Sequence, residues 1–246
     1  MHRSRHPPLV LGHRGYRALF PENTLLAFRE ALAAGADGIE CDLQKSGDGR
    51  YVIIHDATTE RVTGSRIEVG QASSTELRAL DAGRGERLPF LEEMLSELPP
   101  GAYLDLELKE ETVLPQDADR IAPILDARIP RERLMISSFA LGLLVPFRKM
   151  GFTVGLLAGE ETAARGLRGL ASDLLRLRPQ FVNLPVDVLG MFGSRRSALL
   201  FRALRALGFS LLFWTVNSTE EAAVLAPHAR ILVTDEVERT LRTTDS

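Results

Sequence analysis

The sequence repeats one local order three times: an amphipathic helical stretch, then a glycine, then an apolar strand-like run. The glycines of these units are Gly35, Gly151 and Gly208. Each stands where a helix is expected to end and where a residue that tolerates positive φ is favoured. Alternating helices and strands are typical of βαβ units, because parallel neighbouring strands need a crossover connection. This order therefore favours an α/β fold built on a parallel sheet.

Eight runs are predicted to be strands, and their apolar residues are nearly continuous, as expected for strands that are covered on both faces. They are Leu9–His13, Gly38–Leu43, Tyr103–Lys109, Leu134–Phe139, Thr153–Leu157, Phe181–Val186, Ser210–Val216 and Ile231–Thr234. Eight strands with helices between them predict a closed (β/α)8 TIM barrel. An open doubly wound sheet is the alternative, but it usually has a glycine-rich phosphate loop after its first strand, which LGHRGYRALFPEN is not.

The length of the chain, 246 residues, is that of one such barrel, so we expect a single domain over residues 1–246. The alternation is interrupted between Ala57 and Pro100. Its last part, LPFLEEMLSELPPG, is predicted to be the helix that precedes the third strand. The preceding part, about residues 57–88, is predicted to be a small insertion over the mouth of the barrel, where loops diversify function.

Composition narrows the classes of partner. The formal net charge of −3 gives no basic footprint for nucleic-acid binding. No apolar stretch reaches the length that spans a bilayer, and the first apolar run is too short for the core of a signal peptide. The single cysteine, Cys41, excludes an internal disulfide. We therefore expect a cytoplasmic protein that acts on a small molecule without stable membrane insertion, and the oligomeric state stays open.

Charged clusters lie at or just beyond the ends of four apolar runs, LVLGHRG, GIECDL, YVIIHD and AYLDLELK. They are His13-Arg14, Glu40-x-Asp42, His55-Asp56 and Glu107-x-Lys109. In a barrel of parallel strands all carboxyl ends face one side and form the active site. Two imidazoles, two cations and three carboxylates suit metal-assisted chemistry on a phosphate diester.

The carboxylates indicate a metal site. Glu40 and Asp42 are one residue apart, so on a strand their side chains point to the same side, and Glu107 could supply a third ligand. A site of three carboxylates favours one hard divalent cation, Mg²⁺ or Ca²⁺. The simpler interpretation is that these carboxylates pair with arginines. Cys41 should face away from the mouth and serve packing.

His13 and His55 are the candidates for proton transfer, because imidazole titrates near physiological pH. Arg14 can bind two phosphate oxygens with its planar fork, and Lys109 can neutralise the same phosphate as a point charge. Surface ion pairs are the alternative for both cations. Asp56 could orient His55 or cap the following turn, and we expect the supporting role.

Other polar or aromatic residues near predicted strand ends carry weaker signals. Glu22 and Asn23 precede a helix, where Asn23 is a good N-cap, although a helix N-terminus at the mouth would also favour an anion. Trp214 is either a core residue or a wall of the substrate site. Further strand-end polar residues without an assigned role are Ser138, Asn217, Thr234 and Asp235.

These motifs together resemble the glycerophosphodiester phosphodiesterase family. The resemblance rests on HRG, PENT, HD at 55–56, LPFLEEML, LELK, SSF, WTVN and VTD, and it covers nearly the whole chain. It implies a (β/α)8 barrel that hydrolyses glycerophosphodiesters to glycerol 3-phosphate and an alcohol with a divalent metal. Glu40, Asp42 and Glu107 match the metal ligands of the family. His13 and His55 match its acid–base pair, Arg14 and Lys109 its phosphate contacts, and Glu22 and Asn23 stand in its PENT element.

Three other functions stay open at this stage. The first is another phosphodiesterase on the same barrel, a lysophospholipase D or a phospholipase C-like enzyme. The second is a glycosidase that uses Glu40 and Glu107, but two cations and two histidines argue against a neutral sugar. The third is a barrel that binds phosphoesters without turnover, although none of the seven expected catalytic residues is missing.

Overall fold

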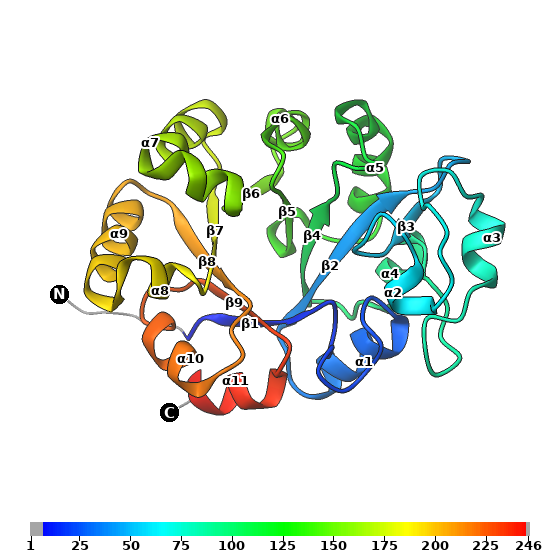
Figure 1. Ribbon diagram of the computed structural model, residues 1–246, viewed down its shortest axis with the longest axis horizontal. Coiled ribbons are helices and arrows are strands. Elements are labelled where there is room, and N and C mark those ends of the chain that lie inside the picture. The colour runs from blue at the N-terminus through cyan, green and yellow to red at the C-terminus, as the bar shows by residue number, and fades with distance from the viewer. Residues whose placement is uncertain (1–6, 245–246) are drawn as a thin grey trace.

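The computed structural model describes residues 7–244, which contain a closed barrel of eight parallel strands (Figure 1). The strands are β1 (Leu9–His13), β2 (Gly38–Lys45), β4 (Tyr103–Leu108), β5 (Leu134–Ser138), β6 (Thr153–Leu157), β7 (Phe181–Pro185), β8 (Ser210–Trp214) and β9 (Ile231–Thr234). They follow one another around the barrel, and β1 pairs with both β2 and β9. This closure confirms the predicted TIM barrel and excludes the open sheet.

Three strands, β1, β6 and β9, have the predicted bounds. Four others end one or two residues before the predicted end, where the chain turns toward the mouth. Only β2 is longer, by two residues, because it continues into a hairpin that the prediction did not include.

That hairpin corrects one expectation. The run YVIIHD was grouped with the ends of parallel strands, but β3 (Tyr51–Ile53) pairs antiparallel with β2. The chain passes beyond the barrel, turns, and comes back, so that Ile54 N donates to Asp42 O at 3.0 Å. His55 therefore reaches the level of Asp42 on a returning strand, because a short turn can join only antiparallel neighbours.

Helices surround the barrel as an outer ring (Figure 1). They are α1 (Leu25–Ala33), α4 (Leu91–Glu97), α5 (Ala118–Asp126), α6 (Leu141–Lys149), α7 (Glu160–Leu177), α8 (Val188–Phe192), α9 (Ser194–Ala206), α10 (Thr219–Leu225) and α11 (Val237–Thr244), with short 3-10 turns η1 (Pro115–Asp117) and η2 (Arg131–Arg133). Gly35, Gly151 and Gly208 all have positive φ at helix ends, as predicted. A capping box of Ser218 and Glu221 begins α10.

Two apolar layers hold the barrel together. The larger one lies between the strands and the outer helices and includes Cys41, which is fully buried there, so its predicted packing role is confirmed. The smaller one fills the interior and includes Leu11, Met135, Phe181 and Leu212. Strand residues alternate between these layers, so each interior apolar residue is followed two positions later by a side chain nearer the mouth.

Residues 57–88 carry α2 (Glu60–Thr63) and α3 (Ser74–Ala79), which lie outside the helix ring at the right of Figure 1. This segment has its own apolar cluster with β3, in which Val52, Ile54, Val69 and Leu77 are buried. Because the cluster is built partly on the hairpin, the segment is fixed to the end of β2 and thus to the mouth of the barrel.

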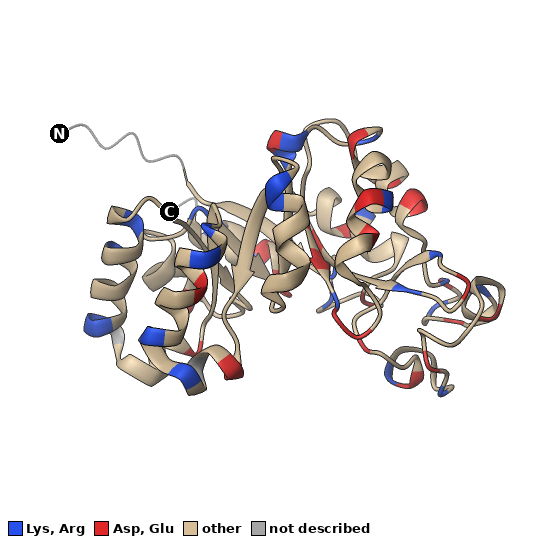
Figure 2. Cartoon of the chain, turned by 90° about the horizontal axis from the view of Figure 1, so that it is seen from above, with Lys and Arg blue, Asp and Glu red and all other residues tan. Residues whose placement is uncertain are grey.

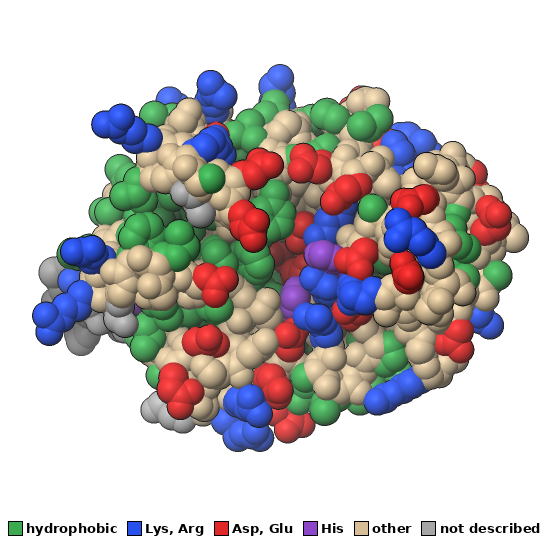
Figure 3. All heavy atoms as spheres, in the orientation of Figure 1, with side chains coloured by type: hydrophobic (Ala, Val, Ile, Leu, Met, Phe, Trp, Pro, Cys, Tyr) green, Lys and Arg blue, Asp and Glu red, His purple; other side chains and the backbone are tan. Residues whose placement is uncertain are grey.

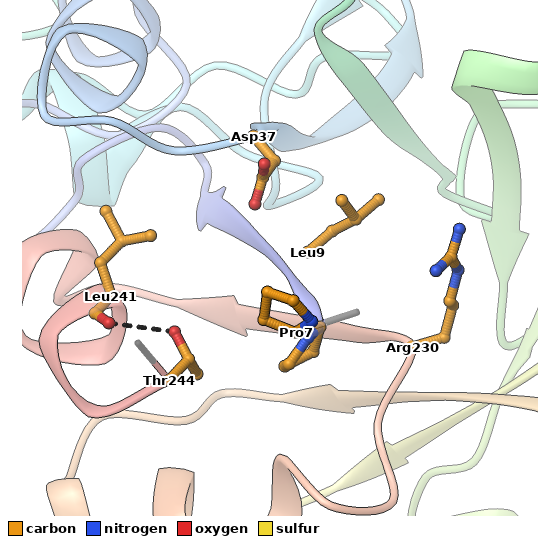
Figure 4. A pocket seen from close by; sticks show the side chains of 7 residues that line it. Pro7, Leu9, Asp37, Arg230, Leu241 and Thr244 are labelled. Carbon is orange, nitrogen blue, oxygen red and sulfur yellow. Dashed lines mark hydrogen bonds between the residues drawn. The ribbon is translucent and has the colours of Figure 1, made fainter. Parts of the chain in front are cut away.

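The other end of the barrel has a cavity of about 380 Å³ at the start of β1. Figure 4 shows Leu9, Asp37, Arg230 and Thr244 around it, with the Thr244 hydroxyl donating to the Leu241 carbonyl. It lies away from the charged strand ends. Charged residues of both signs are spread over the described surface (Figure 2). Among the described residues, no helix combines the length and apolar character needed to cross a membrane.

Candidate active site

A cavity of about 220 Å³ opens at the carboxyl ends of the strands. In Figure 3, charged and histidine side chains gather around this central hollow, and hydrophobic side chains lie to its left. The polar lining consists of His13, Arg14, Glu40, His55, Asp105, Glu107 and Ser137, and the apolar lining of Phe139, Leu157, Leu212, Trp214 and Val233. The predicted strand ends are therefore brought together.

The three predicted metal ligands converge. Ligand oxygens of Glu40, Asp42 and Glu107 all lie within 4.8 Å of one another, and all three residues are buried. The strand register explains this, because Asp42 on β2 lies opposite Glu107 on β4. Side chains of paired residues lie close together on one face of a sheet.

Two cations contact these carboxylates. Lys109 Nζ lies 2.9 Å from Asp42 Oδ1 and also contacts Glu107, and Arg14 Nε lies 3.2 Å from Asp42 Oδ2. Burial alone would raise the pKa of Asp42, but the charges of Lys109 and Arg14 lower it below its ordinary value. Asp42 is therefore ionised.

The negative charges of the other two carboxyls, Glu40 and Glu107, are less well compensated by nearby cations. Burial, together with the charge of Asp42, raises the pKa of Glu40 well above its usual range. The pKa of Glu107 rises to about 7, mainly through burial, although Lys109 opposes the shift. Without a further cation, both groups therefore hold protons at a pH where exposed carboxyls have lost them.

The residues present fit a divalent cation. Asp42 Oδ1 is buried and has no hydrogen-bond donor among the described residues, since the approach of Lys109 is an ion pair without hydrogen-bond geometry. The carboxylates outnumber the neighbouring cations, and all the donors are hard oxygens. Such a set binds Mg²⁺ or Ca²⁺ in preference to softer metals.

Both histidines are anchored in the same manner. His13 Nδ1 lies 2.7 Å from Asp235 Oδ1, and His55 Nδ1 lies 2.6 Å from Asp56 Oδ1. A carboxylate at Nδ1 fixes the tautomer and leaves Nε2 of each ring for a reacting group. Burial lowers the pKa of both imidazoles, although their carboxylate partners oppose the shift. The expected contact of Asp56 with His55 is confirmed.

The turn after β1 brings two adjacent residues to the same cavity. His13 ends the strand, and Arg14 has a φ of 52°, so the chain reverses direction before Arg14 would point away. Gly15 follows with a φ of 82°, and a Cβ at this position would be 2.6 Å from the backbone of Ala27. Glycine is thus required at this turn by both conformation and space.

Glu22 and Asn23 contact other site residues. Arg14 Nη1 donates to Glu22 Oε1 at 2.9 Å, and Arg61 donates to both oxygens of Glu22 at 2.7 and 2.8 Å. Asn23 Nδ2 donates to Asp42 Oδ2 at 2.8 Å. The pKa of Glu22 falls to about 2, because hydrogen bonds and charge from these arginines outweigh burial. The expected substrate contacts of Glu22 and Asn23 stay predictions.

Trp214 lies on the apolar side of the cavity. Its ring packs edge to face against Phe139, with 5.8 Å between the ring centroids. The structure thus places Trp214 on the wall of the site, one of the two positions that the sequence left open.

Asp105 and Arg61 were not predicted as site residues. Asp105 lies in the barrel interior, accepts a hydrogen bond from Ser137 Oγ at 2.7 Å, and has its pKa raised to about 8 by burial. Its two-residue spacing from Glu107 was the available signal. Arg61 also donates to Asp56 at 2.5 Å and thus links the insertion to the His55 pair.

Asp235 was named only as a strand-end residue. Its partnership with His13 depends on the pairing of β1 with β9, which joins residues 222 positions apart. Asn217 holds Asp235 in place, because Asn217 Nδ2 donates to Asp235 Oδ2 at 2.8 Å. Only a closed barrel predicts these contacts.

Comparison with known proteins agrees with this arrangement. The model of the glycerophosphoryl diester phosphodiesterase family matches residues 13–239. A glycerophosphodiester phosphodiesterase from Caldanaerobacter subterraneus subsp. tengcongensis is 31% identical over 224 residues, which are 87% of each chain.

Solved structures give the same result. A glycerophosphodiester phosphodiesterase from Thermotoga maritima superimposes with a TM-score of 0.82 at 29% identity, covering 97% of this chain and 99% of that one. A phosphodiesterase from Oleispira antarctica, solved with the product sn-glycerol 3-phosphate, has a TM-score of 0.82 at 25% identity and covers 98% of both chains. With a family match over nearly its whole length and a barrel of the same shape, this chain belongs to the glycerophosphoryl diester phosphodiesterase family and is a phosphodiester hydrolase.

Proposed function

We propose that this enzyme hydrolyses glycerophosphodiesters to glycerol 3-phosphate and an alcohol, with one divalent cation, Mg²⁺ or Ca²⁺, and with His13 and His55 as the acid–base pair. The observation that carries the proposal is the meeting of three buried carboxylates, two anchored imidazoles and Arg14 around one cavity. The product bound in the Oleispira antarctica phosphodiesterase supports glycerol 3-phosphate as the product.

Glu40, Asp42 and Glu107 would hold the cation. When bound, it supplies Lewis-acid stabilisation of the charge on the phosphoryl oxygens. Arg14 lies in the cavity lining and would bind a phosphate oxygen, while Lys109 keeps Asp42 ionised. Because its side chain contacts Asp42 and Glu107, Lys109 acts on the phosphate mainly through its charge.

We assign different proton-transfer roles to His13 and His55 because their side chains differ in burial. The side chain of His13 is 11% exposed, whereas that of His55 is 34% exposed. Burial disfavours the charged imidazolium, so we assign His13 as the base that accepts a proton from the attacking oxygen. His55, which water stabilises better in its charged form, would protonate the leaving alkoxide. The attacking oxygen is either water or the substrate's own 2-hydroxyl group.

Glu22 and Asn23 are assigned positioning roles. Glu22 holds Arg14 and Arg61 together, and Asn23 fixes one oxygen of Asp42. Asn23 has a φ of 56°, a conformation that non-glycine residues rarely adopt, and functional sites often hold residues in this way. A cytoplasmic location and a role in recycling the headgroup diesters released from phospholipids stay predictions.

The first test is release of glycerol 3-phosphate from glycerophosphocholine and glycerophosphoethanolamine, with Mg²⁺, Ca²⁺ or chelator. We expect release that chelator abolishes. Cation binding should be followed separately by calorimetry at pH 6 in two buffers with different protonation enthalpies. Because the pKa of Glu107 rises to about 7, this carboxyl holds most of its proton at pH 6, and cation binding should release it. Turnover in chelator, or binding without proton release, would contradict the proposed metal site.

The histidine roles can be separated with two leaving groups. His13→Ala and His55→Ala should each lower kcat on glycerophosphocholine by about two orders of magnitude or more. With a p-nitrophenol leaving group, which needs no protonation, only His13→Ala should remain severely impaired. His228, which packs against Phe201 outside the site, offers the control substitution His228→Ala. Equal losses for both variants on both substrates would contradict the assignment of acid and base.

A further inference from the structure

The two imidazoles of the site are attached to the barrel in different ways. His13 pairs with Asp235, which directly follows the neighbouring strand β9, so this contact fixes the ring to the barrel itself. His55 pairs with Asp56, its neighbour in sequence. A contact between adjacent residues orients the ring within its own segment, but it does not fix that segment to the barrel. The place of His55 beside the cavity therefore depends on further contacts.

The segment that carries His55 leaves the sheet just before this residue. The strands β2 and β3 lie side by side in Figure 1 and pair as far as Leu43 and Ile53. One more backbone hydrogen bond follows, in which Ile54 N donates to Asp42 O at 3.0 Å. His55 and Asp56 then lie in a bend that belongs to neither strand. The regular pairing of the hairpin thus ends one residue before the imidazole.

A side chain of β2 supplies the next link. Gln44 is two positions beyond Asp42, so its side chain lies on the same face of the strand, and it is fully buried. Gln44 Nε2 donates to the His55 carbonyl at 2.9 Å. The buried amide therefore holds the backbone of His55 at the point where the hairpin no longer does.

The other end of the Gln44 amide is also held. Thr112 Oγ1 donates to Gln44 Oε1 at 3.2 Å, and the same hydroxyl accepts from Lys45 N at 2.9 Å. Thr112 lies in the loop after β4, where Val113 N donates to Lys109 O at 3.0 Å. Because a buried polar group left unpaired costs more than a hydrogen bond gains, the amide is locked in one orientation.

We propose that Gln44 is a positioning residue for His55, which it holds through the backbone carbonyl beside the cavity. The inference rests on the proposed function, in which the His55 imidazole transfers a proton. Gln44 sets where the ring stands without touching the ring. A misplacement of about 1 Å in such a group can cost about 100-fold in rate. Arg61 restrains the same pair from the insertion, through Asp56, so loss of the Gln44 amide frees the pair on one side only.

The first test is Gln44→Met, which keeps the length of the side chain and removes its amide. We expect kcat on glycerophosphocholine to fall about tenfold to 100-fold, with KM changed less than about twofold. Cation affinity in calorimetry should stay at the wild-type value, because the amide contacts His55 and Thr112 and not the three carboxylates. Gln116→Met, at an exposed position of η1, is the matched control and should keep the wild-type kcat.

A double-mutant cycle tests whether Gln44 acts through His55. In a His55→Ala background the imidazole to be positioned is gone, so Gln44→Met should lower the residual kcat by less than about twofold. The same loss in both backgrounds would assign Gln44 a general structural role and overturn the inference, as would an unchanged kcat in folded Gln44→Met. A wild-type kcat for His55→Ala alone would instead overturn the proposed role of this histidine.

Thr112 offers a second pair of variants, which decides the question even if Gln44→Met does not fold. Thr112→Val keeps the methyl group that packs on Gly70, where a Cβ would lie 3.0 Å from it, and removes only the hydroxyl. It should lower kcat about threefold to tenfold, as expected for one neutral hydrogen bond, whereas Thr112→Ser keeps the hydroxyl and should stay close to the wild type. The loss in Thr112→Val should also disappear in the His55→Ala background. Circular dichroism melting checks that each variant is folded, and equal kcat values for folded Thr112→Val and Thr112→Ser would overturn the inference.

Discussion

Replacing Asp105 with Asn should stabilise the metal-free protein at neutral pH. Asp105 is fully buried, and the pKa of its carboxyl rises from an ordinary 3.8 to about 8, first because of burial and then because of Glu107 and Asp42 nearby. Its Oδ1 accepts a hydrogen bond from Ser137 Oγ at 2.7 Å, which the Oδ1 of Asn can also accept. The substitution therefore removes the titration and keeps the contact.

The sign and size of the effect follow from linkage. Between about pH 4 and pH 8 the folded carboxyl keeps its proton while the unfolded one has lost it, so the free energy of unfolding falls as the pH rises. Each pH unit is worth about 1.36 kcal/mol, which gives ~4 kcal/mol by pH 7. Glu40 and Glu107 also have raised pKa values and act in the same direction, so the variant should keep part of the slope.

The assay is urea unfolding in chelator at pH 5, 6, 7 and 8. The wild-type free energy of unfolding should decline across this range, and Asp105→Asn should decline less and exceed the wild type at pH 7. Asp187→Asn, at an exposed position, is the control and should follow the wild type. A wild-type free energy that does not fall with pH, or the same slope in Asp105→Asn, would refute the reasoning.

Other predictions concern the contacts around the histidines and the cation. Asp235→Asn removes the charge that supports a protonated His13 and should lower kcat about tenfold to 100-fold, with little change in KM; an unchanged kcat would mean that Asp235 does not position His13. Arg61→Met should change stability by less than about 1 kcal/mol, because Arg61 is partly exposed, but should lower kcat by loosening Asp56; circular dichroism melting and steady-state kinetics separate the two effects. Glu107→Gln should weaken Mg²⁺ or Ca²⁺ binding about tenfold or more in calorimetry, and unchanged affinity would remove it from the ligand set.

The barrel could be predicted from the sequence because its strands are buried on both faces and so form nearly continuous apolar runs. The same signal failed at β3, whose run resembles a barrel strand although it pairs antiparallel with β2. An apolar run does not reveal whether a strand is parallel or antiparallel to its neighbour. The length of the connection reveals it, since the five residues between Lys45 and Tyr51 can only form a hairpin.

The site was predictable to the extent that it depends on alternation along single strands. Glu40 and Asp42 point to the same side because they are two positions apart on one strand, and Glu107 was expected to join them from another strand end. The structure confirms that the three residues converge. Asp105 is two residues before Glu107 on the same strand, and this spacing is a signal that the prediction did not use. The contact of Asp235 with His13 could not be predicted from local pattern, because it forms only where β9 closes the barrel against β1.

Barrel closure between β1 and β9 also has a consequence for synthesis and proteolysis. The strand that carries His13 leaves the ribosome well before its carboxylate partner, Asp235, which follows 222 residues later. A nascent chain that stops before β9 lacks both the last wall of the barrel and the anchor of the imidazole that we propose as the base. Removal of the segment from Ile231 onward by a protease would have the same double effect, so partial chains should not release uncontrolled hydrolase activity.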